Sequence, residues 1–115
     1  MCGIVGIVDP SSLPETLRPI VQRMCDVIRH RGPDDEGIYV ESGIGLGSCR
    51  LSILDLSPLG HMPMVDEETG NRIVHNGEVY NFLELRKELV GLGAMGNGEG
   101  AVVTYSPTGK RVVAL

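Results

Sequence analysis

The chain has 115 residues and is poor in aromatic residues, in cysteine and in long apolar runs. Aromatic residues make up 3% of it and tryptophan is absent, so any core must be built from aliphatic side chains. Three cysteines at wide spacing argue against a disulfide framework and for a reducing, cytoplasmic environment. No apolar run approaches the roughly 20 residues of a membrane span, and none resembles a secretory signal. We therefore expect a cytoplasmic protein with no membrane partner.

Positive charge is also scarce. The formal net charge is −5, which argues against a nucleic-acid partner. The three histidines are scattered and lack nearby cysteines, so no metal site is expected. The length suits one small domain.

The start of the chain carries the first chemical signal. If Met1 is removed, which a small residue at position 2 permits, Cys2 carries a thiol and a free α-amine on one residue. A free α-amine has a pKa of about 7.7–8.0 and a thiol one of about 8.5, so one residue can supply both base and nucleophile. The alternative is an ordinary buried cysteine at the start of a first strand.

Apolar periodicity predicts the elements of the first half. Residues 3–8 form a short β-branched run that indicates a buried strand. An amphipathic helix follows a capping-box pattern at Ser12–Glu15 and ends at Gly32-Pro33. Residues 37–40 and 43–51 read as two strands of a hairpin joined at Glu41-Ser42.

The second half is less regular. Residues 72–79 are predicted as a strand, although Asn76-Gly77 interrupts it and by itself favours a plain turn. A second capping-box pattern, Asn81–Glu84, opens a second amphipathic helix. Residues 94–115 form a divergent, Gly-rich tail with two β-prone pieces that could make a short hairpin.

Four segments, in this order and spacing, resemble one family. They are Met1-Cys2-Gly3-Ile4-Val5-Gly6, Arg29-His30-Arg31-Gly32-Pro33-Asp34-Asp35, Arg50-Leu51-Ser52-Ile53-Leu54-Asp55-Leu56 and His75-Asn76-Gly77-Glu78-Val79-Tyr80-Asn81. The family is the glutaminase domain of class II glutamine amidotransferases, which are N-terminal-nucleophile hydrolases, and the second segment is similar to asparagine synthetase. The resemblance covers residues 1–93, roughly the first half of such a domain. It implies an α+β chain that forms the N-terminal part of a four-layer αββα sandwich.

The resemblance also implies a reaction. The Cys2 sulfur attacks the side-chain amide of glutamine, and glutamate and ammonia are released without any cofactor. The Asn76 side chain and the Gly77 backbone N–H are expected to bind the oxyanion.

The glutamine-binding residues follow from the same resemblance. Arg50 is expected to bind the α-carboxylate, and a plain surface arginine is the alternative. Glu78 is expected at the polar end of the substrate, and a solvated strand charge is the alternative. The full predicted set is Arg50, Leu51, Ser52, Ile53, Leu54, Asn76, Gly77 and Glu78.

The implied partner is a synthetase domain, missing here or on a second chain, to which ATP and Mg²⁺ would belong. The family's aspartate for the substrate α-ammonium has no counterpart after Gly91, where Glu99 is the only acid. We therefore expect weak or absent turnover by the chain alone. The alternative function is a truncated, non-catalytic remnant that binds a partner or has no function.

Overall fold

The computed structural model describes residues 2–53, 56, 58–65, 70–77, 79–92, 95–96, 102–103 and 113–114. Contacts divide the chain into two compact units. The first comprises Met1–Leu56 and His61–Asn76, and the second comprises Ser57–Gly60 and Gly77–Leu115. Most of the predicted functional residues fall in the first unit, and each unit is described by itself.

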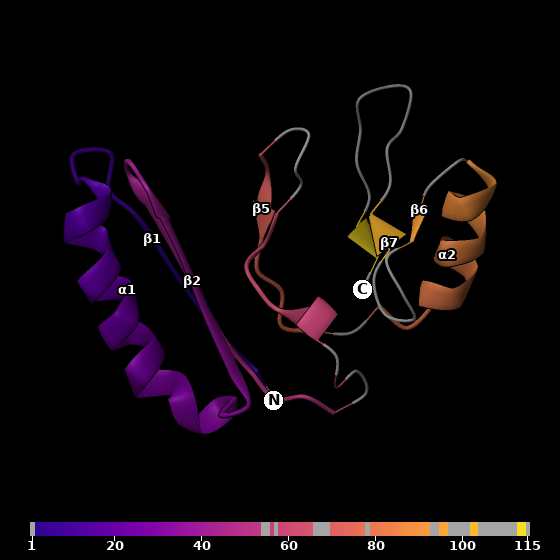
Figure 1. Cartoon of the computed structure of the whole chain (residues 1–115), viewed down its shortest axis with the longest axis horizontal. Helices are drawn as coiled ribbons and strands as arrows, with labels where there is room; N and C mark the ends of the chain where they lie inside the picture. Colours follow the sequence, from indigo (N-terminus) through magenta and orange to yellow (C-terminus); the bar gives the residue numbers. More distant parts are fainter. Residues whose placement is uncertain are drawn as a thin grey trace. The chain divides into compact units, whose positions relative to one another are not determined.

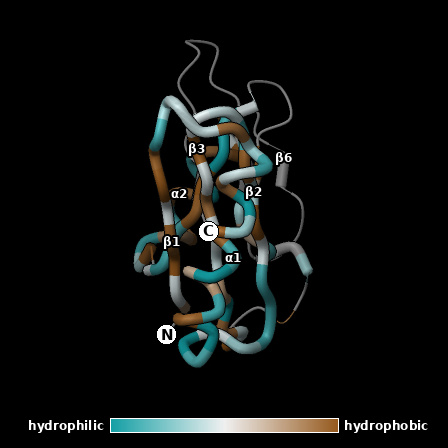
Figure 2. Tube along the Cα trace, turned by 90° about the vertical axis from the view of Figure 1, so that its left-hand side faces the viewer, coloured by the Kyte–Doolittle hydropathy of each residue, from teal (hydrophilic) through white to brown (hydrophobic). Residues whose placement is uncertain are grey.

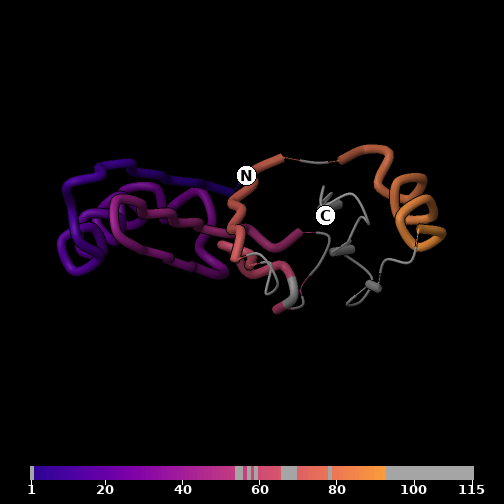
Figure 3. Tube along the Cα trace, turned by 90° about the horizontal axis from the view of Figure 1, so that it is seen from above, coloured from indigo at the N-terminus to yellow at the C-terminus, as the bar shows by residue number. Residues whose placement is uncertain are grey.

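A three-stranded antiparallel sheet forms the centre of the first unit. Its strands are β1 (Gly3–Val8), β2 (Asp35–Glu41) and β3 (Ile44–Arg50), in the order β1-β3-β2. The predicted first strand and the predicted hairpin are both confirmed, but β1 is not buried as expected, because Ile4 and Val8 on it are exposed. The hairpin turns at Gly43, whose φ of +82° belongs to the left-handed region that glycine adopts at no steric cost. In the view from above, β1 is the indigo strand at the edge of the sheet (Figure 3).

Helix α1 (Pro14–Ile28) covers one face of this sheet (Figure 1). Its fully buried side chains are Leu17, Val21 and Cys25. The helix can lie close because β3 presents glycines to it: a Cβ on Gly47 would lie 2.5 Å from the Cys25 sulfur. Hydrophobic stretches on β1, drawn brown in Figure 2, supply part of the core from the sheet. The sheet residues packed against it are Val5, Ile7, Ile38 and Val40.

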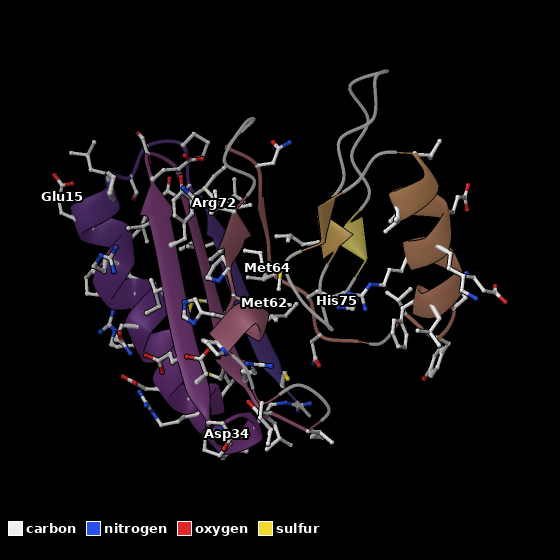
Figure 4. The ribbon with its side chains drawn as sticks, turned by 45° about the vertical axis from the view of Figure 1, so that its right-hand side comes forward. Glu15, Asp34, Met62, Met64, Arg72 and His75 are labelled. Atoms are coloured by element: carbon white, nitrogen blue, oxygen red, sulfur yellow. The ribbon has the colours of Figure 1, made fainter. Side chains whose placement is uncertain are left out.

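A short ribbon lies on the other face of the sheet. It consists of β4 (Met64–Val65) and β5 (Arg72–Ile73), which pair antiparallel. Side chains alternate along a strand, so Tyr39 points away from α1 while Ile38 and Val40 point toward it. The Arg72 guanidinium lies 4.0 Å from the centroid of the Tyr39 ring. Figure 4 shows Arg72 and Met64 on this side, so the first unit has three layers: helix, sheet and ribbon.

The start of α1 differs from the predicted capping box. The helix begins at Pro14, and its N-cap, Leu13, has no side-chain cap. The Ser12 hydroxyl donates instead to the Asp9 carboxylate at 2.6 Å. Asp9 competes because it directly follows β1 and also accepts from the Ser11 hydroxyl at 2.7 Å, which favours its ionised form and lowers its pKa. A 3₁₀ turn, Arg29–Arg31, follows α1, and the chain leaves the helix at Gly32 as predicted.

The second unit holds α2 (Phe82–Gly91), the 3₁₀ turn Pro58–Gly60 and three two-residue strands. The strands are β6 (Met95–Gly96), β7 (Val102–Val103) and β8 (Val113–Ala114), paired in that order. Helix α2 starts where predicted, but the Asn81 side chain makes no cap hydrogen bond. The predicted strand over 72–79 is wrong beyond Ile73 among the described residues, because residues 74–77 leave the ribbon near the Asn76-Gly77 turn signal.

The α+β class is confirmed: helices and antiparallel sheets occur in both units. Among the helices of the described residues, none is long and apolar enough to cross a membrane.

Candidate active site

Cys2 lies beside the end of β3. Gly3, the first residue of β1, pairs with Cys49, so the residue before it reaches the backbone that follows β3. The Leu51 N–H donates to the Cys2 sulfur at 3.3 Å, and the thiol lies 3.7 Å from the Leu51 carbonyl oxygen. The half-buried Cys2 thiol is therefore held by backbone groups of the segment predicted to wall the substrate pocket.

Asn76 reaches the same residue from the segment after β5. Its side-chain Nδ2 donates to the Cys2 carbonyl oxygen at 2.9 Å, across a sequence separation of 74 residues. The Arg31 Nε donates to the same carbonyl at 3.4 Å. In Figure 3 the segment after β5 passes beside the N-terminus, as this contact requires. The predicted nucleophile and one predicted oxyanion donor are thus neighbours.

The remaining predicted residues vary in their placement. Arg50 is the half-buried last residue of β3, and its carbonyl oxygen accepts from the Asp34 N–H at 3.0 Å. Leu51 and Ser52 are half-buried, while Ile53 is 70% exposed. Gly77 is exposed and belongs to the second unit. Leu54 and Glu78 lie outside the described residues.

Asp34 makes a contact that was not predicted, although the resemblance includes this residue in the second of its four segments. Its carboxylate accepts from the Ser52 N–H at 2.7 Å. Gly32 brings this loop onto β3, because a Cβ there would lie 2.2 Å from the Cys49 carbonyl oxygen. The available signals were the resemblance of this segment and the Gly32-Pro33 helix stop, and neither specifies which backbone the loop touches.

His75 and His61 each make one contact in the first unit. The His75 N–H donates to the Met62 sulfur at 3.2 Å, and Figure 4 shows both residues in the region next to the ribbon. The His61 ring lies 2.7 Å from the Asp35 carboxylate. The first contact uses the backbone of His75 and the second uses the ring of His61.

The other two cysteines differ sharply from Cys2. Cys25 and Cys49 are fully buried, and the Cys49 thiol donates to the Cys25 carbonyl at 3.5 Å. Burial raises the pKa of the Cys25 thiol to about 12, and the neighbouring Cys49 adds to the rise. Burial likewise raises the pKa of Cys49. These two thiols belong to the core.

Comparison with known sequences decides the family. The sequence model of the family described as "Glutamine amidotransferase domain" matches residues 1–114. The chain belongs to this family. The match runs past the four segments that carry the resemblance, up to β8.

Several relatives of this glutamine amidotransferase domain are named glutamine-hydrolysing asparagine synthetases. One, a putative asparagine synthetase 2 of Methanocaldococcus jannaschii, is 43% identical over 106 residues, covering 76% of this chain and 20% of the relative. Asparagine synthetase 1 of Bacillus subtilis is 40% identical over 91 residues, covering 77% and 14%. Asparagine synthetase B of Escherichia coli is 36% identical over 88 residues, covering 76% and 16%. The chain therefore spans a fifth or less of each of these relatives.

Proposed function

We propose that this domain hydrolyses the side-chain amide of glutamine to glutamate and ammonia, with Cys2 as nucleophile. The observation that carries the proposal is the 2.9 Å hydrogen bond from Asn76 to Cys2. This bond brings together two residues that are 74 positions apart in the sequence. Cys2 can attack a carboxamide, and Asn76 can stabilise the resulting oxyanion. Membership of the glutamine amidotransferase family supplies the substrate class.

The first step forms a thioester. With Met1 removed, the Cys2 α-amine takes the thiol proton and the sulfur adds to the amide carbon of glutamine. The α-ammonium then gives its proton to the amide nitrogen, the carbon–nitrogen bond breaks, and ammonia leaves. The same amine next takes a proton from water, and the hydroxide adds to the thioester carbon. The carbon–sulfur bond then breaks, and the α-ammonium returns its proton to the sulfur, so glutamate leaves and both the thiol and the free amine are restored.

Asn76 and Gly77 are the proposed oxyanion donors. A side-chain amide has two N–H groups, and the Asn76 amide uses one on the Cys2 carbonyl. The second N–H is the one we assign to the tetrahedral oxyanion, together with the backbone N–H of Gly77. In this proposal the contact to Cys2 holds the Asn76 amide close to the glutamine carbon that Cys2 attacks, before glutamine binds. Such preorganisation gives oxyanion donors their effect on rate.

The substrate's other groups are assigned to neighbouring positions. The Arg50 guanidinium is proposed to bind the α-carboxylate, whose planar geometry it matches. Leu51, Ser52, Ile53 and Leu54 are proposed as the pocket wall, and Glu78 as an acceptor at the polar end. This reaction assigns no cofactor to the chain.

In the whole protein we propose that ammonia passes to a synthetase domain that makes asparagine, in the cytoplasm. The names of the relatives support this assignment. ATP and Mg²⁺ would act in that domain. Among the described residues, no group of three or more His, Cys, Asp and Glu side chains is placed to hold a metal ion.

Glutamate release from glutamine by the whole protein that carries this domain tests the proposal, because turnover by the chain alone is expected to be weak or absent. Cys2→Ala is expected to abolish release, because no other described thiol lies at this site. Asn76→Asp keeps the size but loses the donor, and we expect a loss of about 10²–10³ in rate. The matched control is Asn81→Ala, at a side chain that makes no cap hydrogen bond, and it should leave the rate unchanged. Release that survives Cys2→Ala would refute the proposal.

A further inference from the structure

The backbone that holds the Cys2 sulfur lies beyond the end of a strand. Strand β3 ends at Arg50, and the Leu51 N–H that donates to the sulfur at 3.3 Å comes one residue later. Pairing of β3 with β1 reaches Cys49 and pairing with β2 reaches Arg50, so neither ladder includes Leu51. Something other than the sheet must fix the direction of this N–H.

Asp34 makes two hydrogen bonds that flank Leu51. Its backbone N–H donates to the Arg50 carbonyl at 3.0 Å, and its carboxylate accepts from the Ser52 N–H at 2.7 Å. One bond acts on the residue before Leu51 and the other on the residue after it. Each bond fixes a backbone group next to Leu51, so the two bonds together restrict the direction of the Leu51 N–H.

The loop that carries Asp34 is itself fixed. At Gly32 the backbone approaches β3 so closely that a Cβ would lie 2.2 Å from the Cys49 carbonyl oxygen and 2.6 Å from the Arg50 carbonyl carbon. The next residue of this loop is Pro33, whose ring restricts its own backbone φ angle. The Arg31 Nε donates to the Cys2 carbonyl at 3.4 Å, so the same loop also contacts the nucleophile's own backbone. Figure 4 shows Asp34 at the end of the sheet where these contacts occur.

We propose that Asp34 is a positioning residue that clamps the backbone on both sides of Leu51 and thereby holds the Leu51 N–H against the Cys2 sulfur. This inference rests on the proposed function for its catalytic consequence. The clamp itself is independent of glutamine, because it consists of hydrogen bonds within the chain.

Three substitutions separate the hydrogen bond from the charge. Asp34→Ala removes the acceptor. Asp34→Asn keeps an oxygen in the same place but loses the charge, and Asp34→Glu keeps the charge but displaces the oxygen by one methylene. If the clamp is geometric, the Asn variant behaves like the parent protein and the Glu variant like Asp34→Ala. The Asn–Glu pair also decides the question should the Ala variant fail to fold.

Two measurements test whether Asp34 holds the backbone around Leu51. Amide hydrogen exchange of Leu51 and Ser52, followed by NMR, should speed up about tenfold in Asp34→Ala and Asp34→Glu and change less than about threefold in Asp34→Asn. Alkylation of Cys2 by an electrophilic glutamine analogue, with a chloroketone in place of the amide, should slow by about tenfold in the same two variants. Asp35→Ala is the matched control: it removes the adjacent carboxylate, which contacts His61 rather than Ser52, and should leave both readouts unchanged.

Unchanged exchange at Leu51 in Asp34→Glu, or exchange in Asp34→Asn as fast as in Asp34→Glu, would overturn the clamp. The two proposals fail separately. If Cys2 of the parent protein does not react with the analogue while the exchange pattern is as expected, the clamp stands and the glutaminase proposal fails. If the analogue labels Cys2 equally fast in all Asp34 variants, the catalytic part of the Asp34 inference is wrong and the glutaminase proposal is unaffected.

Discussion

At the scale of single residues, environment divides three cysteines into two kinds. Cys2 is half-buried and its sulfur is held by the Leu51 backbone. Cys25 and Cys49 have no exposed surface and pack between α1 and β3. The thiolate is the reactive species, so burial that disfavours the charged form also suppresses reactivity.

This difference predicts selective alkylation. With its pKa raised to about 12, Cys25 would be a thiolate in only about one molecule in 10⁴ at pH 8, and access to the core is blocked as well. Iodoacetamide at pH 8 should therefore label Cys2 in the folded chain and leave Cys25 and Cys49 unmodified, as read by peptide mass mapping. The same treatment in denaturant is the control and should label all three. Labelling of Cys25 at the rate of Cys2 in the folded chain would contradict the assignment of Cys25 to the core.

The residue scale also shows where sequence reasoning stops. Cys2 and Asn76 were chosen from their chemistry and from the resemblance, and the structure brings them into contact. Their roles remain predictions. The hydrogen bond from Ser52 to Asp34 could not be predicted, because nothing in a Gly-Pro-Asp pattern specifies which backbone N–H will donate to the carboxylate.

At the scale of elements, the sheet and α1 depend on glycine at their contact. A side chain at Gly47 would meet the Cys25 sulfur at 2.5 Å and Val5 Cγ2 at 2.8 Å. Gly6 on β1 is different, because its nearest neighbour would be Leu46 Cδ2 at 3.7 Å, an ordinary van der Waals distance. The two positions therefore form a matched pair within one sheet.

Gly47→Ala should lower the free energy of unfolding by about 1–3 kcal/mol, because overpacking forces the helix and the sheet apart. Gly6→Ala should change it by less than about 1 kcal/mol, since the added methyl group fits and the unfolded chain loses freedom. Urea unfolding of the two variants measures both values. Equal midpoints for the two variants would show that close packing of α1 on β3 is not what requires Gly47.

The positions of β1 and α1 were predicted well because each element follows a single residue pattern. The β-branched run predicted the strand β1, and the helical spacing predicted α1 and its buried face. The expected full burial of β1 is wrong, because Ile4 and Val8 are 44% and 76% exposed. The ends were predicted less well. Asp9 takes the hydroxyl of Ser12 away from the expected cap, and the strand predicted over 72–79 ends at Ile73. In both places a local polar contact or turn outweighed the longer pattern.

At the scale of the whole molecule, the family and the α+β class were predicted from four short segments, and both are confirmed. The division between residues 1–93 and the tail remains a prediction, and the family match itself runs to residue 114. The chain spans 20% of the archaeal relative and 14% of the Bacillus one, so synthesis of asparagine is proposed only for a whole protein. What this chain offers by itself is the proposed nucleophile Cys2, the neighbouring Asn76 amide and the backbone that contacts the Cys2 sulfur.

The central claim is that Cys2, with its α-amine free, forms a thioester with glutamine. The most direct measurement is the mass of the N-terminal peptide after the chain is mixed with glutamine and quenched in acid. We predict a peptide that begins at Cys2, without Met1, and carries one glutamyl group that is absent from the peptides of Cys25 and Cys49. Release of glutamate while that peptide stays unmodified in every quenched sample, or while it still begins with Met1, would contradict the account.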